Sequence, residues 1–414
     1  MRIAGAAMAA FVPVLFACFN PAKRGERGEF RCPNRPCGPI TANGNLTMYC
    51  LGLGQTNPGS RMRRTLLLPC AGKSSRYPGV RPKWMLTLPS GELALARAAA
   101  SLPSGSYDRI VVAVRAEHEA RYQTVALLER VFGDAAEVLV LPLDTRGPAD
   151  TVSEMILGAG VEGPFAIKDA DSFFDPAPLP DTSFVALSDI RKNPQMSNVG
   201  AKSFAVINEN NLVVEMIEKS LASNFVSVGL YGFSDAAAYL ESFAATRAAT
   251  ETGELFVSHV MNRAIADGMA VTPLPVQGLI DVGTLEDWRR HVRTRGTIVT
   301  DLDGVVFQNH SRYFAPFWDD EDVPIEGNVA ALRSFQEQGA QIVFMTARPE
   351  AYRAKTEGAL RRLGLQPHAI VMDCRHGRRF LINDHAASNP YPSAVAISTE
   401  RNSPTLAEYM KDWL

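Results

Sequence analysis

The strongest constraint on the fold is an alternation of short apolar runs with longer amphipathic runs between Thr65 and Arg293. LLLP precedes LALARAAASL, RIVVAVRA precedes HEARYQTVALLERVF, and AEVLVLP follows. The apolar runs have the composition of strands, and the longer runs have the period of helices. Strands that alternate with helices favour a parallel sheet covered by helices, which is an α/β fold of the doubly wound type.

A mixed region follows this alternation. PFAIKDADSFF, SFVALSDI and SNFVSVGLYGF are strand-like, and KSFAVINENNLVVEMIEK predicts a hairpin. A helix is predicted for residues 255–266. We therefore expect a doubly wound core that carries an additional sheet on its substrate side.

The loop after the first strand has the composition of a phosphate-binding turn. Residues 71–76 read AGKSSR, and a glycine-containing turn at the carboxyl end of a parallel strand lets backbone N–H groups approach a triphosphate. GKSS is not a P-loop, because that motif needs a glycine where Leu67 stands inside the strand. Arg76 and Lys83 add cations that would stabilise the charge developing on a leaving pyrophosphate.

The segment LPCAGKSSRYPGVRPKWML resembles the signature of nucleoside-triphosphate transferases that act on sugar phosphates and phosphocholine, in which AGxxSR is followed by PK. The resemblance covers most of residues 65–293 and implies a nucleotide-diphospho-sugar transferase fold of the GT-A-like kind. It also implies attack of a phosphate oxygen on the α-phosphorus of a nucleoside triphosphate, release of pyrophosphate, and a Mg²⁺ ion that bridges the phosphates. Ser74 stands where this family commonly has a second glycine.

Acidic residues further along the chain match the metal ligands of the same family. Asp169 and Asp171 lie two positions apart, so on a strand both carboxylates would face one side and could meet a metal ion. Asp171 matches the family's metal-binding aspartate best. Asp281, in DVGTLEDW, stands where the family has its second metal ligand.

Two further segments match the family in its own order. GPADT at residues 147–151 resembles the turn beside the nucleoside, and Glu218-Lys219 resembles the pair that touches the sugar or the phosphate of the acceptor. The resemblance implies Arg76 and Lys83 as catalytic residues. The residues that it implies for nucleotide or substrate binding are Ala71, Gly72, Lys73, Ser74, Ser75, Gly147, Asp150, Glu218 and Lys219.

A second strand with an acidic end opens a new domain near Gly296. TIVTDLDGVVF places Asp301 and Asp303 at the carboxyl end of an apolar strand, where both side chains face the same way. One carboxylate could attack phosphorus while the other handles the proton of the leaving group. Both acids need a nearby cation to ionise, and Mg²⁺ would screen them from each other and from the phosphate.

The DLDG strand resembles the first motif of haloacid-dehalogenase-type phosphatases, and the later motifs follow in order. QIVFMTAR ends a second predicted strand in Thr346, whose hydroxyl would donate to a phosphoryl oxygen. RRFLINDH ends a third predicted strand in Asp384, which would complete a metal site with the two earlier acids. The basic residue that bridges nucleophile and phosphate is assigned to Lys355, with Arg378 and Arg379 as alternatives.

These segments predict two Rossmann-like doubly wound α/β domains, a transferase at residues 63–294 and a phosphatase at residues 295–414. The intervals between the phosphatase motifs hold little beyond one helix each, so we expect no large cap and an open site. Residues 1–62 differ in composition from both domains. They fit an upstream extension of the coding region before Met62, a secretory signal or anchor, or a disordered arm.

The net charge and the cysteines limit the kinds of ligand that this chain is expected to bind. The formal net charge of the 414 residues is -2, which gives no footprint for nucleic acid. The six cysteines include no two pairs with the CxxC spacing of a zinc site. We expect a reduced, cytoplasmic enzyme with small ligands, namely a nucleoside triphosphate and a sugar phosphate or small alcohol phosphate, and with no nucleic-acid or membrane partner.

The motifs together predict a bifunctional, Mg²⁺-dependent enzyme of nucleotide-sugar or surface-polysaccharide biosynthesis. Its first domain would transfer a nucleotidyl group and release pyrophosphate, and its second would hydrolyse a phosphomonoester. The alternative is an inactive transferase fold that senses a nucleotide sugar and regulates an active phosphatase. Intact Arg76, Lys83, Asp171 and Asp281 argue against that alternative.

Overall fold

The computed structural model describes residues 64–194, 196–309, 321–384 and 394–411. The predicted extension at residues 1–62 lies outside these ranges. Residues 64–294 contain a nine-stranded sheet, and residues 295–411 contain a three-stranded sheet. We call these two parts the nine-stranded region and the three-stranded region.

The nine strands lie in the order β3-β2-β1-β4-β9-β6-β10-β8-β7. The pairs β3–β2, β2–β1 and β1–β4 are parallel, whereas β9 runs antiparallel to both β4 and β6. β10 is parallel to β6 and antiparallel to β8. The strand bounds are β1 Thr65–Pro69, β2 Arg109–Arg115, β3 Ala136–Leu141, β4 Phe165–Lys168, β6 Ser183–Asp189, β7 Ser203–Ile207, β8 Val213–Glu218, β9 Phe225–Phe233 and β10 Val271–Pro275.

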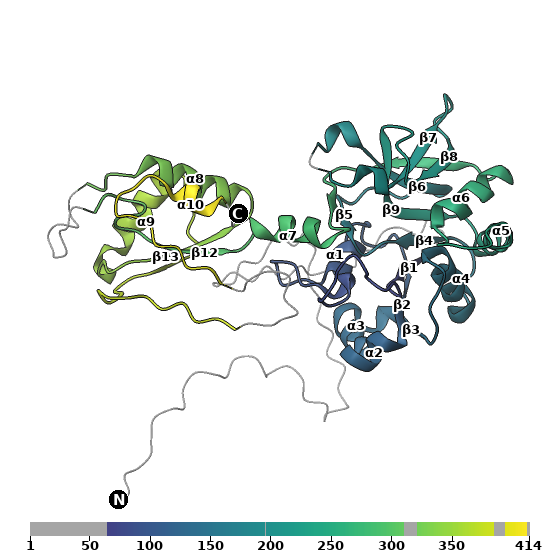
Figure 1. The fold of residues 1–414 in the computed structure, drawn as a ribbon, viewed down its shortest axis with the longest axis horizontal. Coiled ribbons are helices and arrows are strands. Elements are labelled where there is room, and N and C mark those ends of the chain that lie inside the picture. The colour runs from purple at the N-terminus through teal and green to yellow at the C-terminus, as the bar shows by residue number, and fades with distance from the viewer. Residues whose placement is uncertain (1–63, 195, 310–320, 385–393, 412–414) are drawn as a thin grey trace, which may run out of the picture. The chain divides into compact units, whose positions relative to one another are not determined.

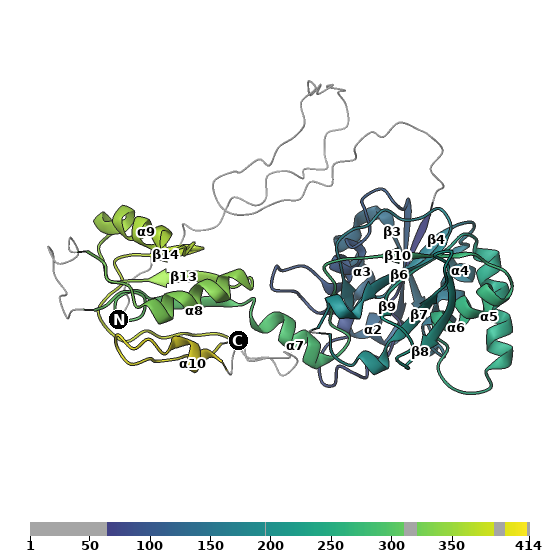
Figure 2. The same ribbon diagram turned by 90° about the horizontal axis from the view of Figure 1, so that it is seen from above.

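Helices cover both faces of this sheet, which confirms the predicted doubly wound α/β core. Leu67 packs in one apolar cluster with α4 and α6, while Leu66 and Leu68 pack in a second cluster with α1 and α3. Figure 1 labels these helices, and Figure 2 shows α3 and the group α4 to α6 on opposite sides of the strands. The bounds are α1 Ala94–Ala99, α2 Ala116–Tyr122, α3 Thr124–Phe132, α4 Pro148–Ala159, α5 Ala236–Ala249, α6 Val257–Ala266 and α7 Leu285–Arg293.

The run HEARYQTVALLERVF forms two helices rather than one, because the backbone breaks at Gln123. Gln123 has a left-handed conformation with φ 52° and ends α2. The Glu119 side chain then accepts hydrogen bonds from Thr124 Oγ1 at 2.6 Å and from Val125 N at 2.8 Å. Glu119 thereby satisfies free donors at the start of α3.

The mixed region contains the predicted hairpin and helix, but β6 to β10 continue the nine-stranded sheet instead of forming the predicted additional sheet. β7 and β8 form the predicted antiparallel hairpin, and the predicted helix at residues 255–266 is α6. A separate two-stranded sheet joins β5 (Ser172–Phe173) to β11 (Ile280–Asp281), with Asp281 opposite Ser172. This small sheet brings two distant acidic segments together at the carboxyl end of β4.

The three-stranded region is built on parallel strands in the order β12-β13-β14. Its core contains Leu302, Leu332, Phe344, Leu360 and Leu406. The bounds are β12 Thr297–Asp301, α8 Glu326–Glu337, β13 Gln341–Met345, α9 Arg353–Arg362, β14 Ala369–Val371 and α10 Leu406–Met410. Residues 310–320, in the interval where a cap was considered, lie outside the described ranges.

The third predicted strand of this region was wrong. Residues 378–384 form no strand, and Phe380 and Ile382 are 82% and 91% exposed. β14 pairs with β13 instead, and Thr346 N also donates to Val371 O at 2.9 Å. The earlier apolar triplet AIV, which follows α9 closely, therefore occupies the edge of β13. The three strands do not show a second doubly wound domain, which stays a prediction.

Candidate active site

The loop after β1 begins the candidate site. Ser74 has φ 51°, a left-handed conformation that glycine adopts more easily than serine. Its carbonyl accepts from Tyr77 N at 2.8 Å and its hydroxyl accepts from Lys83 N at 3.3 Å. Ser74 thus adopts a glycine-like backbone at the position where the motif that it resembles commonly has glycine, and the two hydrogen bonds support the turn.

The two predicted catalytic cations converge on one predicted metal ligand. Lys83 Nζ lies 2.5 Å from Asp171 Oδ2, and Arg76 Nη2 lies 3.9 Å from the same oxygen. Asp171 is 15% exposed at its side chain. Burial alone would raise the pKa of Asp171, but the charge and hydrogen bond of Lys83 and the charge of Arg76 lower it below its usual value. Asp171 is therefore a carboxylate at neutral pH.

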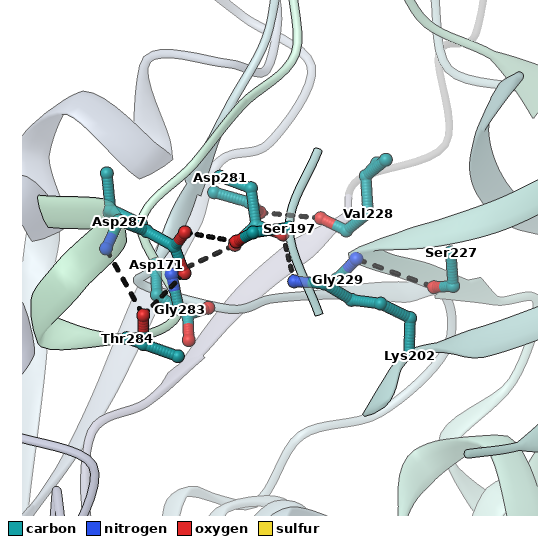
Figure 3. A network of polar contacts seen from close by, with 12 residues as sticks. Asp171, Ser197, Lys202, Ser227, Val228, Gly229, Asp281, Gly283, Thr284 and Asp287 are labelled. Atoms are coloured by element: carbon teal, nitrogen blue, oxygen red, sulfur yellow. Dashed lines mark hydrogen bonds and ion pairs between the residues drawn. The ribbon is translucent and has the colours of Figure 1, made fainter. Parts of the chain in front are cut away.

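Asp281 lies near Asp171 because the β5–β11 sheet joins the two segments that carry them. Val282 N donates to Asp171 O at 2.9 Å, which ties the two acidic segments together. Gly283 N donates to Asp281 Oδ1 at 2.9 Å, and Lys202 forms an ion pair with Asp281 Oδ2. Figure 3 shows the side chain of Lys202 extending to Asp281. Lys202 carried no motif in the sequence, and only the hairpin fold could have indicated it.

Asp169 and Asp171 do not lie on a strand as predicted, because β4 ends at Lys168 and β5 begins at Ser172. Both nevertheless line one cavity. Burial and the neighbouring Asp171 charge raise the pKa of Asp169. A Cβ atom on Gly229 would lie 2.5 Å from Asp169 Oδ2, so this glycine leaves the space that the Asp169 carboxyl occupies.

Lys168 anchors the turn that carries these two acids. Its side chain is 0% exposed, and its ammonium donates to Asp169 O at 2.7 Å and to Ser172 O and Oγ at 2.8 Å. It also lies 5.2 Å from the ring centre of Phe174. Burial lowers the pKa of Lys168 to about 8, against the opposing charge of Asp169.

The GPADT turn forms another wall of the site. Gly147 has φ 138°, and a Cβ atom there would lie 2.6 Å from Leu255 O. Asp150, predicted to bind nucleotide, is bonded inside the protein instead: its Oδ2 accepts from Arg146 N at 2.8 Å, and its Oδ1 lies 3.5 Å from Arg247 Nη1. The cavity wall here is Gly147, Pro148 and Thr151, so Asp150 supports the turn from behind.

The predicted acceptor pair lies at the end of β8. Glu218 Oε2 accepts hydrogen bonds from Ser203 Oγ and, at 2.7 Å, from Ser258 Oγ. Lys219 Nζ lies 4.3 Å from the centre of the Phe256 ring. The two serines fix the Glu218 carboxylate, while the half-exposed Lys219 ammonium lies 4.0 Å from Glu254 Oε2.

One cavity of about 750 Å³ contains nearly all of these groups. Its volume lies in the range of small-molecule sites. Lys73 lines it but forms an exposed ion pair of 2.8 Å with Asp144. The predicted residues that line the cavity are Ala71, Gly72, Lys73, Ser74, Ser75, Arg76, Lys83, Gly147, Asp171, Glu218, Lys219 and Asp281, whereas Asp150 does not.

The oxygen ligands of the cavity suit Mg²⁺. Mg²⁺ is commonly held by one or two carboxylates together with substrate phosphates and waters, and Asp171 and Asp281 supply two carboxylates on joined segments. Across the described ranges, no three acidic, histidine or cysteine side chains are grouped to hold a metal ion. A cation here would therefore depend on phosphate oxygens as well as on the protein.

In the three-stranded region, arginines hold the two predicted catalytic acids. Arg379 contacts both oxygens of Asp301, at 2.8 and 3.2 Å. Arg348 lies 2.6 Å from Asp303, whose other oxygen also accepts from the buried Thr346 hydroxyl at 3.3 Å. Arg379 was one of three basic candidates in the sequence, and Arg348 was not among them.

Arg348 is the centre of a buried polar network. It is 3% exposed, pairs with Asp322 at 2.6 Å as well as with Asp303, and donates to Thr356 Oγ1 at 3.4 Å. Its guanidinium lies 5.2 Å from the centre of the Phe307 ring. The sequence offered a weak signal, since TAR directly follows β13, but nothing in the pattern indicated the partner Asp322.

Asp384 and Lys355 are the two other residues predicted for this region. Asp384 follows the segment that forms no strand, and it joins no metal-holding group of three with Asp301 and Asp303 within the described ranges. Lys355 lies on α9. The metal role of Asp384 and the catalytic role of Lys355 stay predictions.

No protein-family model and no curated protein matches this chain. Among solved structures, a nucleoside-diphosphate-sugar pyrophosphorylase from Vibrio cholerae RC9 is 22% identical, with a TM-score of 0.48 over 55% of this chain and 99% of that one. An inositol-1-phosphate CTP transferase from T. maritima is 16% identical, with a TM-score of 0.44 over 54% and 91%. A UDP-glucose pyrophosphorylase complexed with UDP-glucose is 14% identical, with a TM-score of 0.44 over 55% and 96%.

Each of these three structures is similar to about half of this chain. None of the helices in the described ranges is long and apolar enough to span a bilayer.

Proposed function

We propose that the nine-stranded region transfers a nucleotidyl group from a nucleoside triphosphate to the phosphate of a sugar phosphate or small alcohol phosphate. The observation that carries this proposal is the meeting of Arg76, Lys83, Asp171 and Asp281 in one cavity whose wall also includes Glu218 and Lys219. An acid pair with adjacent cations suits the triphosphate, and the Glu-Lys pair suits a hydroxylated, anionic acceptor.

The chemistry assigned to these residues is electrostatic. Arg76 and Lys83 would bind the departing pyrophosphate, whose charge grows as the bond to the α-phosphorus breaks. Backbone N–H groups of residues 71–75 would hold the phosphates in place. Bound Mg²⁺, held by Asp171 and Asp281, would neutralise phosphate charge.

The acceptor end favours a sugar phosphate over phosphocholine. A quaternary ammonium group is usually bound against aromatic faces, but the Lys219 ammonium already covers the Phe256 ring at 4.3 Å. A second cation at that face would meet like-charge repulsion. The fixed Glu218 carboxylate can instead accept hydrogen bonds from sugar hydroxyls.

For the three-stranded region we propose phosphomonoester hydrolysis of the haloacid-dehalogenase type. Asp301 would be the nucleophile, Asp303 the proton-transfer group, and Thr346 a hydrogen-bond donor to the phosphoryl group. The support is the position of Asp301 as the last residue of β12, the position of Asp303 two residues later, and the Thr346–Asp303 hydrogen bond of 3.3 Å. Lys355 and Asp384 are proposed as the bridging base and the further metal ligand. A cytoplasmic role in nucleotide-sugar or surface-polysaccharide synthesis would use both activities.

Pyrophosphate release tests the transferase. The full chain is incubated with Mg²⁺, each of four nucleoside triphosphates, and a panel of sugar phosphates with phosphocholine, and free phosphate is followed in parallel. We expect pyrophosphate that depends on one acceptor and is lost in Asp171→Ala but kept in the exposed control Asp181→Ala. Nucleotide binding without turnover across the whole panel would instead favour the sensing alternative.

Phosphate release from a phosphomonoester panel tests the second activity. Asp301→Asn should abolish it, and the exposed control Glu337→Gln on α8 should leave it unchanged. Equal phosphate release by wild type and Asp301→Asn would reject the assignment of the nucleophile.

A further inference from the structure

Lys202 is a cation of the cavity that no motif indicated. Its ammonium pairs with Asp281, and the two side chains are 21% and 18% exposed. Its position in the chain is fixed from both sides, because Lys202 N donates to Val199 O at 3.1 Å and Lys202 O accepts from Lys219 N at 2.9 Å. A rigid backbone thus carries a long side chain that ends inside the cavity.

The base of the β7–β8 hairpin places Lys202 beside the proposed acceptor residues. Ser203, the next residue, lies opposite Glu218 in the strand register, and its hydroxyl donates to the Glu218 carboxylate. Lys202 therefore stands between the predicted metal ligand Asp281 and the acceptor end of the cavity. Rotation about its side-chain bonds could move its ammonium between the two without moving the backbone.

Both oxygens of Asp281 are already engaged. Oδ1 accepts from Gly283 N at 2.9 Å, and Oδ2 is held by Lys202. A Cβ atom on Gly283 would lie 3.6 Å from Lys202 Nζ and 3.7 Å from Arg76 Nη1, so these two cations converge on the same side of the glycine. A divalent cation that binds Asp281 Oδ2 must displace the Lys202 ammonium, which then needs another anion.

We propose that Lys202 exchanges partners during ligand binding, and this rests on the proposed nucleotidyl-transfer function. In the free protein Lys202 neutralises Asp281. When a divalent cation takes Asp281, Lys202 moves to a phosphate oxygen of the acceptor. Lysine suits this role because its charge is compact and sits on a flexible stem.

The exchange couples two binding events. Without phosphate, Lys202 competes with the metal ion for Asp281, so the metal binds weakly. With phosphate present, the displaced ammonium gains a new partner, so each ligand strengthens the binding of the other by the same factor. The class of ligand that completes the exchange is a phosphate monoester dianion.

The test measures Mn²⁺ binding by the full chain, from the electron paramagnetic resonance signal of unbound Mn²⁺, with and without inorganic phosphate. Removing a partly buried ion pair that competes with the metal should tighten Mn²⁺ binding roughly tenfold in Lys202→Met without phosphate. Phosphate oxygens can also bind the metal ion directly, so phosphate should tighten Mn²⁺ binding in both proteins, but more in wild type than in Lys202→Met. The exposed control Lys192→Met should match wild type in both conditions.

Two further variants secure the interpretation. Lys202→Gln, which is uncharged but still a donor, should also bind Mn²⁺ more tightly, and its thermal midpoint checks that the fold is kept. Asp281→Asn combined with Lys202→Met should lose the gain. The proposal is overturned if Lys202→Met binds Mn²⁺ no more tightly than wild type, if phosphate tightens its Mn²⁺ binding as much as that of wild type, or if the double variant keeps the gain.

These measurements need no turnover, so they separate the two proposals. Coupled Mn²⁺ and phosphate binding without pyrophosphate release would reject the transferase and leave the exchange intact. Pyrophosphate release by a protein whose Lys202→Met variant shows no tighter Mn²⁺ binding would reject the exchange alone.

Discussion

Replacement of the buried Lys168 by methionine should remove a specific dependence of stability on pH. Lys168 is 0% exposed, and burial lowers its pKa to about 8 from the ordinary 10.5. Between these two pH values the unfolded chain keeps the proton that the folded protein has released. Because the unfolded state binds more protons there, the free energy of unfolding rises with pH.

The size of this pH dependence follows from the difference between the folded and unfolded pKa values of Lys168. One pKa unit corresponds to about 1.4 kcal/mol, so Lys168 contributes a rise of about 3 kcal/mol in the free energy of unfolding between roughly pH 8 and pH 10.5. Below pH 8 the group is protonated in both states, and its contribution no longer changes. Lys168→Met cannot titrate and should lack this rise, although it also loses three hydrogen bonds to Asp169 O and to Ser172 O and Oγ.

The assay is urea unfolding at several pH values, followed by tryptophan fluorescence. Trp84 and Trp288 are each 1% exposed in the nine-stranded region, so their emission reports its unfolding. Other groups titrate in this range in the unfolded chain, including the Tyr231 hydroxyl and the Cys70 thiol, because burial raises their pKa values above the range in the folded protein. They contribute equally to both proteins, so the difference between wild type and Lys168→Met isolates the lysine.

This reasoning would be refuted if the free energies of unfolding of wild type and Lys168→Met differed by the same amount at every pH from 7.5 to 10.5. Parallel curves would mean that Lys168 keeps an ordinary pKa and that its ammonium is hydrated. Lys192→Met, which removes an exposed lysine, should follow wild type throughout. A control that loses the rise as well would assign the effect to overall charge.

Three further changes test other parts of the structure. Gly147→Ala should lower the free energy of unfolding by about 2 kcal/mol, because the residue has φ 138° and its new Cβ atom would lie 2.6 Å from Leu255 O. An unchanged melting temperature would contradict this prediction. Arg348→Met should lower the free energy of unfolding by about 3 kcal/mol, because it leaves Asp303 and Asp322 without their arginine partner. Amide hydrogen exchange should then be faster in β12 and β13, and unchanged exchange rates would show that the network does not stabilise these strands. Phe380→Ser should change stability by less than about 0.5 kcal/mol, since Phe380 is 82% exposed; a loss of several kcal/mol in denaturant titration would restore the rejected strand.

Much of the first site could be predicted because its residues follow strand ends. A strand-helix alternation places successive loops at one edge of the sheet, so the loop at residues 71–76 and the acids after β4 were expected to meet. They do line one cavity, together with Asp281. The sequence pattern could not show which charged groups face the cavity and which bond inside the protein. Asp150, for example, was predicted to bind nucleotide but accepts a hydrogen bond from Arg146 N behind its turn.

The missed residues share a physical cause. Lys202 and Asp281 are 79 positions apart, and Arg348 is 26 positions from Asp322. Neither pair has a local spacing that a sequence pattern could register, because tertiary folding alone brings them together. The rejected strand at residues 378–384 is the opposite case, since its local apolar pattern was clear but β14 pairs with β13 instead.

The partners of the acids distinguish the two candidate sites. Asp171 and Asp281 are paired closely by Lys83 and Lys202, whose side chains remain about a quarter exposed. Lysine ammonium groups on flexible stems can change partners at little cost. The partner exchange proposed for the first site therefore needs only side-chain movement.

The second site is held differently. Burial alone would lower the pKa of Arg348, but its hydrogen bonds to Asp303 and Asp322 raise it above its usual value, so the group stays charged. Separating Arg348 from Asp303 would leave a buried charge with one partner fewer, which is costly. If Asp303 took up a proton in the proposed phosphatase reaction, Arg348 would still have the Asp322 carboxylate as a partner. The Arg348–Asp322 pair therefore keeps the buried guanidinium paired even when the charge of Asp303 changes.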